Sequence, residues 1–399
     1  MNRYTDGQSG ESAYRARGIK PGTERTRELL DRLGKPDKSL KTVHIAGSNG
    51  KGSVAEFITE ILVAAGKRVG TFTSPVVYSY NGQFRVDGVP ICDDKLGEYI
   101  SAAENVSSGT GATRFEIETA AAFYAFYSEG CEYAVIECGM GGSFDSTNAA
   151  VNKQIAVITS VSLEHTQYLG DTLSKIAVQK AGIIGDCPAV VSACVPESVR
   201  NVFLSAGAEI AEPVKVTGAH SFEYEGKIYE LSAEGARQHC NAACAIKVAE
   251  KLGICERAVF DGVKATKPEG RLQRFLRDGV TYILDGAHNA EAVAALAEFI
   301  GAKYADTENS LVFGCMSDKE PGETLGILKG LFFEVIAVSP QSPRAMSAEE
   351  IYRACRENFE NAKKAGSVSA ALEASRGKTV VVSGSFALLK EAKEWIERK

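Results

Sequence analysis

Short apolar runs alternate along most of the chain with segments whose apolar residues recur at helical spacing. Residues 42–46 form a short, β-branched apolar run, which is typical of a buried parallel strand. From Val54 to Ala65 the apolar residues share one helical face, and Gly66 follows as a closing residue. The pattern therefore predicts a strand, a loop over residues 47–53 and a helix.

The same rhythm continues beyond this first unit. Further strands are predicted at residues 68–73, 131–138, 155–160 and 189–192, and helices at residues 24–33, 115–129, 169–180 and 233–252. Residues 221–231 are predicted to form a hairpin.

Residues 267–271 interrupt the pattern and are the predicted linker. Beyond them, strands are predicted at residues 282–285, 311–313, 335–338 and 379–383, and helices at residues 290–302, 322–331, 347–356 and 385–397. The predicted fold class is α/β: a P-loop-type, mostly parallel sheet flanked by helices, plus a smaller Rossmann-like C-terminal domain. The predicted domains are residues 1–270 and 271–399.

Composition narrows the class of protein. The chain has 399 residues, 44% of them hydrophobic, and a net charge of −6, which argues against a nucleic-acid partner. It has no apolar run long enough to span a membrane and no apolar signal region at its polar N-terminus. The ten cysteines are scattered and contain no C-x-x-C pair. We therefore expect reduced thiols and a cytoplasmic protein.

The loop after the first strand has the features of a phosphate-binding loop. Glycines let backbone N–H groups approach an anion, and the following helix N-terminus adds partial positive charge. The predicted nucleotide-binding residues in it are Gly47, Ser48, Asn49, Gly50, Lys51, Gly52 and Ser53. Compared with the usual G-x-x-x-x-G-K-[ST] motif, an extra glycine separates lysine from serine. The alternative is an ordinary glycine-rich turn with a surface lysine.

Polar residues at or just past three other strand ends are candidates to meet this loop. Ser74, Glu137 and His165 each follow a different predicted strand, and ligands bind at the carboxyl ends of parallel strands. An unpaired carboxylate ending an apolar strand is costly, so a metal or a cationic partner would explain Glu137. The alternatives are that Glu137 caps the turn at residues 139–142 and that His165 is an ordinary loop histidine.

Four further residues are weaker candidates. Lys180 ends a helix, where the helix dipole favours a lysine in any case. Asp285 and His288 lie between a strand end and a helix start, where they can contact a nucleotide or simply shape a capping loop. Arg271 follows Gly270 and is a candidate phosphate clamp. A nucleotide loop alone leaves kinase, ATPase switch and ligase open.

Taken together, the motifs resemble the folylpolyglutamate synthase and dihydrofolate synthase family of the Mur ligase superfamily. The matching stretches run in the family's order and are His44-Ile-Ala-Gly-Ser-Asn-Gly-Lys-Gly-Ser53, Thr71-Phe-Thr-Ser-Pro75, Glu137-Cys-Gly-Met-Gly-Gly142, Asp145-Ser-Thr-Asn148, Ile158-Thr-Ser-Val-Ser-Leu-Glu-His165, Leu169-Gly-Asp-Thr-Leu173, Lys180-Ala-Gly-Ile-Ile184, Gly270-Arg271, Asp285-Gly-Ala-His-Asn289 and Ser383-Gly-Ser385.

The resemblance implies an ATP- and Mg²⁺-dependent amide ligase. A folate or dihydropteroate carboxylate would become an acyl phosphate, and L-glutamate would then attack it. The resemblance gives Lys51, His165 and Lys180 catalytic roles and makes Lys180 a carbamylated lysine. It assigns Mg²⁺ to Ser53, Ser74, Glu137 and His165, and nucleotide contacts to Asn241, Arg271 and Asp285. It also places His288, the further candidate for a nucleotide contact, on the glutamate side together with Ser385. It also implies a monomer.

The chain departs from the family pattern in one loop. Val76-Val77 stands where the family usually has histidine and leucine, and Asn81-Gly82-Gln83-Phe84-Arg85 stands for Asn-Glu-Arg-Ile-Arg. A glutamate and an arginine are thus missing from the loop that helps bind the pterin. The alternative is a Mur-like ligase that acts on a non-folate carboxylic acid.

Overall fold

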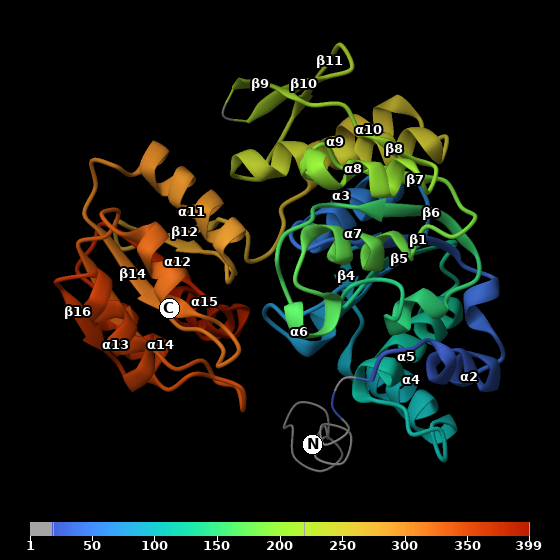
Figure 1. Cartoon of the computed structure of the whole chain (residues 1–399), viewed down its shortest axis with the longest axis horizontal. Coiled ribbons are helices and arrows are strands. Elements are labelled where there is room, and N and C mark those ends of the chain that lie inside the picture. Colours follow the sequence, from blue (N-terminus) through green and yellow to red (C-terminus); the bar gives the residue numbers. More distant parts are fainter. Residues whose placement is uncertain (1–17, 19, 219, 399) are drawn as a thin grey trace. The chain divides into compact units, whose positions relative to one another are not determined.

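The first predicted strand lies near the middle of an eight-stranded sheet. In the computed structural model, which describes residues 18, 20–218 and 220–398, the strand order is β4-β3-β2-β5-β1-β6-β7-β8 (Figure 1). The strands are β1 (Lys41–Ala46), β2 (Val69–Phe72), β3 (Phe84–Val86), β4 (Val89–Pro90), β5 (Tyr133–Glu137), β6 (Lys153–Ile158), β7 (Ala189–Val191) and β8 (Ala208–Ile210). From β2 to β8 all neighbours are parallel, whereas β3 and β4 add an antiparallel edge.

Both faces of this sheet are buried, because successive side chains of a strand point to opposite faces. On β1, Val43 and Ile45 pack into a core formed with helices α3 (Lys51–Ala64), α9 (Ala236–Lys251) and α10 (Glu256–Ala265). On β5, Ala134 and Ile136 face the other side. The helices of that side are α2 (Glu24–Arg32), α4 (Asp93–Val106), α5 (Arg114–Ser128), α7 (Leu173–Ala181) and α8 (Glu197–Leu204).

A three-stranded antiparallel sheet lies beside α9 and α10 (Figure 1). It consists of β9 (Lys215–Gly218), β10 (Ser221–Tyr224) and β11 (Lys227–Glu230), and β10 and β11 form the predicted hairpin. Its Phe222 and Tyr229 stack, and Tyr229 stacks in turn on Phe260 of α10 at 4.5 Å. These aromatic contacts attach the small sheet to the helices.

The C-terminal part of the chain forms a second sheet with the order β12-β13-β17-β14-β15-β16. Its strands are β12 (Gln273–Arg277), β13 (Val280–Leu284), β14 (Asn309–Phe313), β15 (Glu334–Ala337), β16 (Ala362–Lys364) and β17 (Thr379–Ser383). Only β12 is antiparallel to its neighbour. Its helices are α11 (Ala290–Lys303), α12 (Pro321–Leu328), α13 (Ala348–Asn358), α14 (Val368–Ala374) and α15 (Leu389–Glu397). This is the predicted Rossmann-like α/β domain.

The chain divides into two compact units. The first contains the described residues up to Pro75 and residues 80–233 and 238–267, and the second contains residues 76–79, 234–237 and 268 onward. The main change of unit therefore falls within the predicted linker, between Lys267 and Pro268. Two four-residue segments, residues 76–79 and 234–237, also belong to the second unit. The predicted domain boundary assigned both of them to the first domain.

The structure corrects some predicted elements. Instead of one helix over residues 169–180 there are two, α6 (Thr166–Leu169) and α7, because Gly170 adopts a φ of 100° between them and Thr172 caps α7. Helices α8, α10 and α14 and strands β3, β4, β12 and β16 were not predicted.

Two further findings bear on the sequence predictions. All ten cysteines are free thiols. Across the described residues, no helix combines the length and the apolar character needed to cross a lipid bilayer. The polar N-terminus that carried the signal-peptide argument lies outside the described residues.

Candidate active site

The glycine loop is held against the end of β6 by backbone contacts. Ser48 N donates to the carbonyl of Ser160 at 3.0 Å, and Asn49 N donates to its hydroxyl at 2.8 Å. Thr159 Oγ1 donates to the Asn49 carbonyl at 2.6 Å. A Cβ atom on Gly47 would lie 1.9 Å from Thr159 Oγ1, so only glycine allows the loop to approach this strand end so closely.

Helix α3 begins earlier than predicted, inside the loop assigned to residues 47–53. Gly50 is its N-cap with a φ of 87°, and Lys51 is its first residue. Lys51 Nζ donates to the carbonyl of Gly47 at 3.0 Å, and Ser48 O lies 3.3 Å away. The loop thus combines a helix N-terminus and an ammonium group around one short stretch of backbone, which is the arrangement that binds phosphate.

Glu137 points into this loop. Its side chain is 3% exposed, and Oε1 lies 3.9 Å from Lys51 Nζ. Oε2 accepts from the backbone N–H of Ser74 at 3.2 Å and would lie 3.5 Å from a Cβ atom on Gly52. In the glycine turn that follows, Asp145 Oδ2 accepts from Met140 N at 2.8 Å. The turn thus has a capping carboxylate of its own in Asp145.

The donors around Glu137 suit a hard cation such as Mg²⁺, which prefers oxygen ligands. The Glu137 carboxylate lies beside Ser74 and beside Gly52, the residue before Ser53, and Ser53 is 2% exposed. Among the described residues, no three His, Cys, Asp or Glu side chains gather at a metal-binding distance. A metal here would therefore rely on one carboxylate, hydroxyl groups and phosphate oxygens, as Mg²⁺ sites at nucleotides commonly do.

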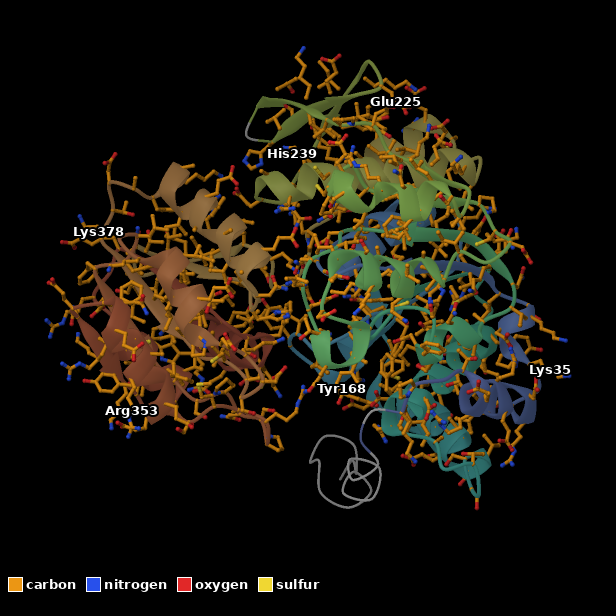
Figure 2. All side chains as sticks on the ribbon, viewed as in Figure 1. Lys35, Tyr168, Glu225, His239, Arg353 and Lys378 are labelled. Atoms are coloured by element: carbon orange, nitrogen blue, oxygen red, sulfur yellow. The ribbon has the colours of Figure 1, made fainter. Side chains whose placement is uncertain are left out.

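His165 starts α6, just beyond β6. Its φ is 46°, in the left-handed region, and its side chain is exposed. Tyr168 of the same short helix is also exposed and is labelled in Figure 2. His165 remains a proposed metal ligand because of its position beyond this strand end.

Lys180 is not a surface lysine at a helix end. Its side chain is fully buried, and Nζ donates to Glu164 Oε1 at 2.6 Å. Burial lowers the pKa of the Lys180 amine, against the attraction of Glu164. Burial alone would raise the pKa of the Glu164 carboxyl, but the charges of Lys180 and Lys51 outweigh it and lower that pKa to about 2. Glu164 therefore stays ionised between the buried lysine and the loop.

Asn241 lies on α9, directly against the glycine loop. Its Oδ1 would be 2.6 Å from a Cβ atom on Gly50, and its Nδ2 donates to Gln238 Oε1 at 3.0 Å. The Nε2 of Gln238 donates to Ser53 Oγ at 3.3 Å. A nucleotide role for Asn241 thus stays a prediction, and Gln238 is an additional residue at the loop.

The three remaining candidates lie in the second unit. Asp285 accepts from Leu272 N and Ala287 N, both at 2.8 Å, so part of its role is to shape this loop. Burial raises the pKa of Asp285, while the charge of Arg271 opposes that rise. The Arg271 guanidinium lies 4.4 Å from the centre of the Phe386 ring, and the His288 ring lies 6.1 Å from it. Phe386 thus gathers these side chains at the end of β13.

The structure brings most of the predicted residues together within each unit. In the first unit the loop, Glu137 and Ser74 are adjacent, and Asn241 lies against the loop. Glu164 and Gln238 were missed as functional candidates. The signal for Glu164 was a carboxylate directly before His165. The signal for Gln238 was an amide one helical turn before Asn241.

Two family models match the chain. The Mur ligase middle domain matches residues 45–248, and the Mur ligase glutamate ligase domain matches residues 270–386. The chain is 35% identical over 384 residues to the dihydrofolate synthase/folylpolyglutamate synthase of Bacillus subtilis, covering 88% of both chains.

Solved structures agree with these matches. Escherichia coli FolC in complex with DHPP and ADP has a TM-score of 0.85 at 28% identity, covering 95% of this chain and 94% of that one. A bifunctional folylpolyglutamate synthase/dihydrofolate synthase from Yersinia pestis, complexed with AMPPNP and Mn, has a TM-score of 0.83 at 26% identity and covers 97% and 98%.

Proposed function

The chain belongs to the folylpolyglutamate synthase/dihydrofolate synthase family of Mur ligases, and we propose that the residues around its phosphate loop carry out that family's reaction. It is an ATP-dependent C–N ligase that forms an amide bond between L-glutamate and a carboxylate of a folate-type acceptor. The observation that carries the residue assignment is the meeting of Lys51, Glu137 and Ser74 at the glycine loop.

The reaction has two steps that both need negative charge to be screened. An acceptor carboxylate oxygen attacks the γ-phosphorus of ATP, ADP leaves, and an acyl phosphate forms. The amine of L-glutamate then attacks the acyl carbon, loses a proton and expels inorganic phosphate. Both steps gather anions in one place, so cationic groups must stabilise the transition states.

The residues of the loop take defined parts in this proposal. The N–H groups of the loop and of α3 bind the phosphates, and Lys51 Nζ exchanges its carbonyl partners for a phosphate oxygen. Ser53, Ser74, Glu137 and His165 hold Mg²⁺, which supplies charge neutralisation on the phosphates when bound. Asn241, Arg271, Asp285 and His288 contact the nucleotide.

We propose that Lys180 is carbamylated. The neutral amine attacks CO₂, forms an N–C bond and loses a proton, and the resulting carboxylate supports the metal. Burial lowers the pKa of this amine and so favours its neutral form. Intact-protein mass spectrometry at neutral pH should detect a mass increase of one CO₂ that disappears on acidification and in Lys180→Ala.

The organisation that goes with this function is a two-domain enzyme, residues 1–270 and 271–399. We propose a cytoplasmic monomer, in line with the free thiols and with the family resemblance. L-glutamate and a folate or dihydropteroate are its substrates in this proposal.

The acceptor is tested by ADP release with Mg-ATP and L-glutamate. Release with dihydropteroate alone identifies a dihydrofolate synthase, release with a reduced folate monoglutamate alone identifies a polyglutamylating enzyme, and release with both identifies a bifunctional one. A folded, ATP-binding protein that is silent with both contradicts the folate assignment. The altered loop at residues 76–85 would then point to a non-folate acid.

A further inference from the structure

Gln238 links the nucleotide-binding helix α9 to the serine that is proposed to hold Mg²⁺. Its Nε2 donates to Ser53 Oγ at 3.3 Å, and its Oε1 accepts from Asn241 Nδ2 at 3.0 Å. All three side chains are buried, with exposed fractions of 6% for Gln238, 2% for Ser53 and 7% for Asn241. The next residue on the helix, His239, is labelled in Figure 2, and its ring centre lies 5.6 Å from that of Phe222.

The two contacts fix the direction of the Gln238 amide. Asn241 Nδ2 is a donor and needs an oxygen opposite it, so Gln238 must present Oε1 on that side. Its Nε2 then faces Ser53. Asn241 in turn is confined because its Oδ1 packs against Gly50, where no Cβ atom fits.

This arrangement decides how the Ser53 hydroxyl is presented. A hydroxyl has one proton and two lone pairs, and Gln238 occupies one lone pair. The second lone pair and the proton are left for groups on the loop side. A serine hydroxyl without such a partner rotates, and in a helix it commonly donates to the carbonyl four residues earlier.

We propose that Gln238 is a positioning residue that sets the Ser53 hydroxyl to offer a lone pair to a divalent cation. This inference rests on the proposed role of Ser53 as a Mg²⁺ ligand. An uncharged amide suits the position, because it donates to Ser53 without adding a second anion beside Glu137 and the phosphates. A carboxylate at residue 238 would instead accept the Ser53 proton.

The test compares ADP binding with and without the cation. Isothermal titration of Gln238→Met with ADP in excess Mg²⁺ should show binding weakened about fivefold, the value expected for one lost hydrogen bond to a buried group. In EDTA the same variant should bind ADP within about twofold of the unchanged protein. Gln154→Met is the matched control, because Gln154 bonds to Asn152 at the opposite end of the sheet, at the start of β6.

Two outcomes overturn the proposal. An equal loss in Mg²⁺ and EDTA would mean that Gln238 only supports the fold of the loop, and no loss in either would mean that it does not orient Ser53. If Gln238→Met fails to fold, Gln238→Asn replaces it, because the shorter amide keeps its polarity and loses its reach to Ser53. The same Mg²⁺-selective loss is then expected.

Ser53→Ala separates this proposal from the function it rests on. If Ser53→Ala leaves the Mg²⁺ dependence of ADP binding unchanged, Ser53 is no ligand and both proposals fall. If Ser53→Ala shows the Mg²⁺-selective loss and Gln238→Met does not, only the role of Gln238 falls. The double variant should lose no more than Ser53→Ala alone, since both changes act on one hydroxyl.

Discussion

The ammonium group of Lys51 is bonded within the protein itself. Its ammonium lies over the loop that precedes it, bonded to carbonyl oxygens and 3.9 Å from the Glu137 carboxylate. An ammonium makes three donor contacts, and a phosphate oxygen is a stronger partner than a carbonyl. In the proposed function, Lys51 would exchange these carbonyl partners for a phosphate oxygen by moving its own side chain.

Replacing Lys51 should remove ligation and spare the fold. In Lys51→Ala we expect kcat for ADP release to fall by roughly 100-fold or more, because a charge that stabilises the phosphoryl transfer is lost. Lys67→Ala is the control, since Lys67 pairs at the surface with Glu132. Circular dichroism should give the same melting curve for both variants, and near-normal turnover of Lys51→Ala would contradict its role in the loop.

His44, in the strand before the loop, should make stability depend on pH. It is fully buried, its Nε2 lies 2.8 Å from Thr147 Oγ1 and 3.1 Å from Cys138 Sγ, and no described residue bonds to its Nδ1. Burial, with a smaller contribution from the charge of Lys153, lowers the pKa of His44 well below 6.5. Below about pH 6.5, His44 therefore binds a proton in the unfolded chain and stays neutral in the folded protein.

The sign follows from that difference. The stability due to neutral His44 is complete above about pH 6.5 and is lost as the pH falls below it, by up to about 1.4 kcal/mol per pH unit. Urea unfolding between pH 7.5 and 5 should show this slope, and His44→Gln should reduce it by about that amount. Equal slopes in the two proteins would show that His44 is not the titrating group.

At the residue scale, candidate side chains could be predicted from their position at strand ends, but the residues that they contact could not. Lys51, Ser74 and Glu137 follow strand ends, and parallel topology alone places such ends along one edge. Glu164 and Gln238 act through contacts with residues that are 16 and 185 positions away. A local sequence pattern does not relate residues so far apart, so these contacts could be identified only from the folded structure.

At the scale of elements, the buried strands were predictable and several helices were not. Strands β1, β5 and β17 are buried over most or all of their length because both sheet faces are covered. Helix α10 was missed because it spans only ten residues and carries a glycine, a poor helix former, at residue 262. Its role appears only in its contact with α3.

Gly262 should be indispensable to that contact. A Cβ atom there would lie 2.5 Å from both N and Cα of Ile61 in α3, and a backbone cannot yield as a flexible side chain does. We expect Gly262→Ala to lower the free energy of unfolding by about 1–3 kcal/mol, the cost of overpacking. Chemical denaturation measures it, and weaker ADP binding should accompany the loss because α3 carries the phosphate loop.

Gly326→Ala is the matched control for this prediction. Gly326 is also helical, in α12, but its nearest neighbour would be Asn358 Oδ1 at 3.8 Å, an ordinary contact. Alanine should stabilise this helix by about 0.5–1 kcal/mol through its higher helix propensity. Equal effects of the two substitutions would show that the approach of α10 to α3 is not the cause.

At the scale of the whole molecule, the two units do not correspond to two continuous pieces of chain. Residues 76–79 leave the first unit between Pro75 and Tyr80 and belong to the second. The loop in which the sequence departs from its family is therefore shared, with residues 76–79 in one unit and residues 80–85 in the other. A linker can be predicted from proline and glycine in a sequence. A four-residue segment that belongs to the other unit, such as residues 76–79, has no such sequence pattern.

Tyr78 anchors this segment and offers a test of the division. Its hydroxyl donates to Gln273 Oε1, which also accepts from Gly270 N at 3.1 Å, and Lys393 Nζ lies 4.3 Å from the centre of its ring. Tyr78→Phe removes only the hydrogen bond and should cost about 1 kcal/mol. Tyr78→Ala also removes the ring contacts and should cost about 2–3 kcal/mol.

Hydrogen exchange shows which part of the protein loses stability in these variants. In Tyr78→Ala, peptides from β12 and β13 should exchange faster while those from β1 and β5 keep their protection, because local stability follows the unit in which a contact is made. Tyr80→Phe is the counterpart, since the Tyr80 hydroxyl bonds to Glu118 and Arg114 of α5. It should loosen α5 and leave β12 unchanged. Faster exchange of β1 and β5 in Tyr78→Ala would mean that residues 76–79 are held by the first unit, and the altered loop of residues 76–85 would then belong to one unit only.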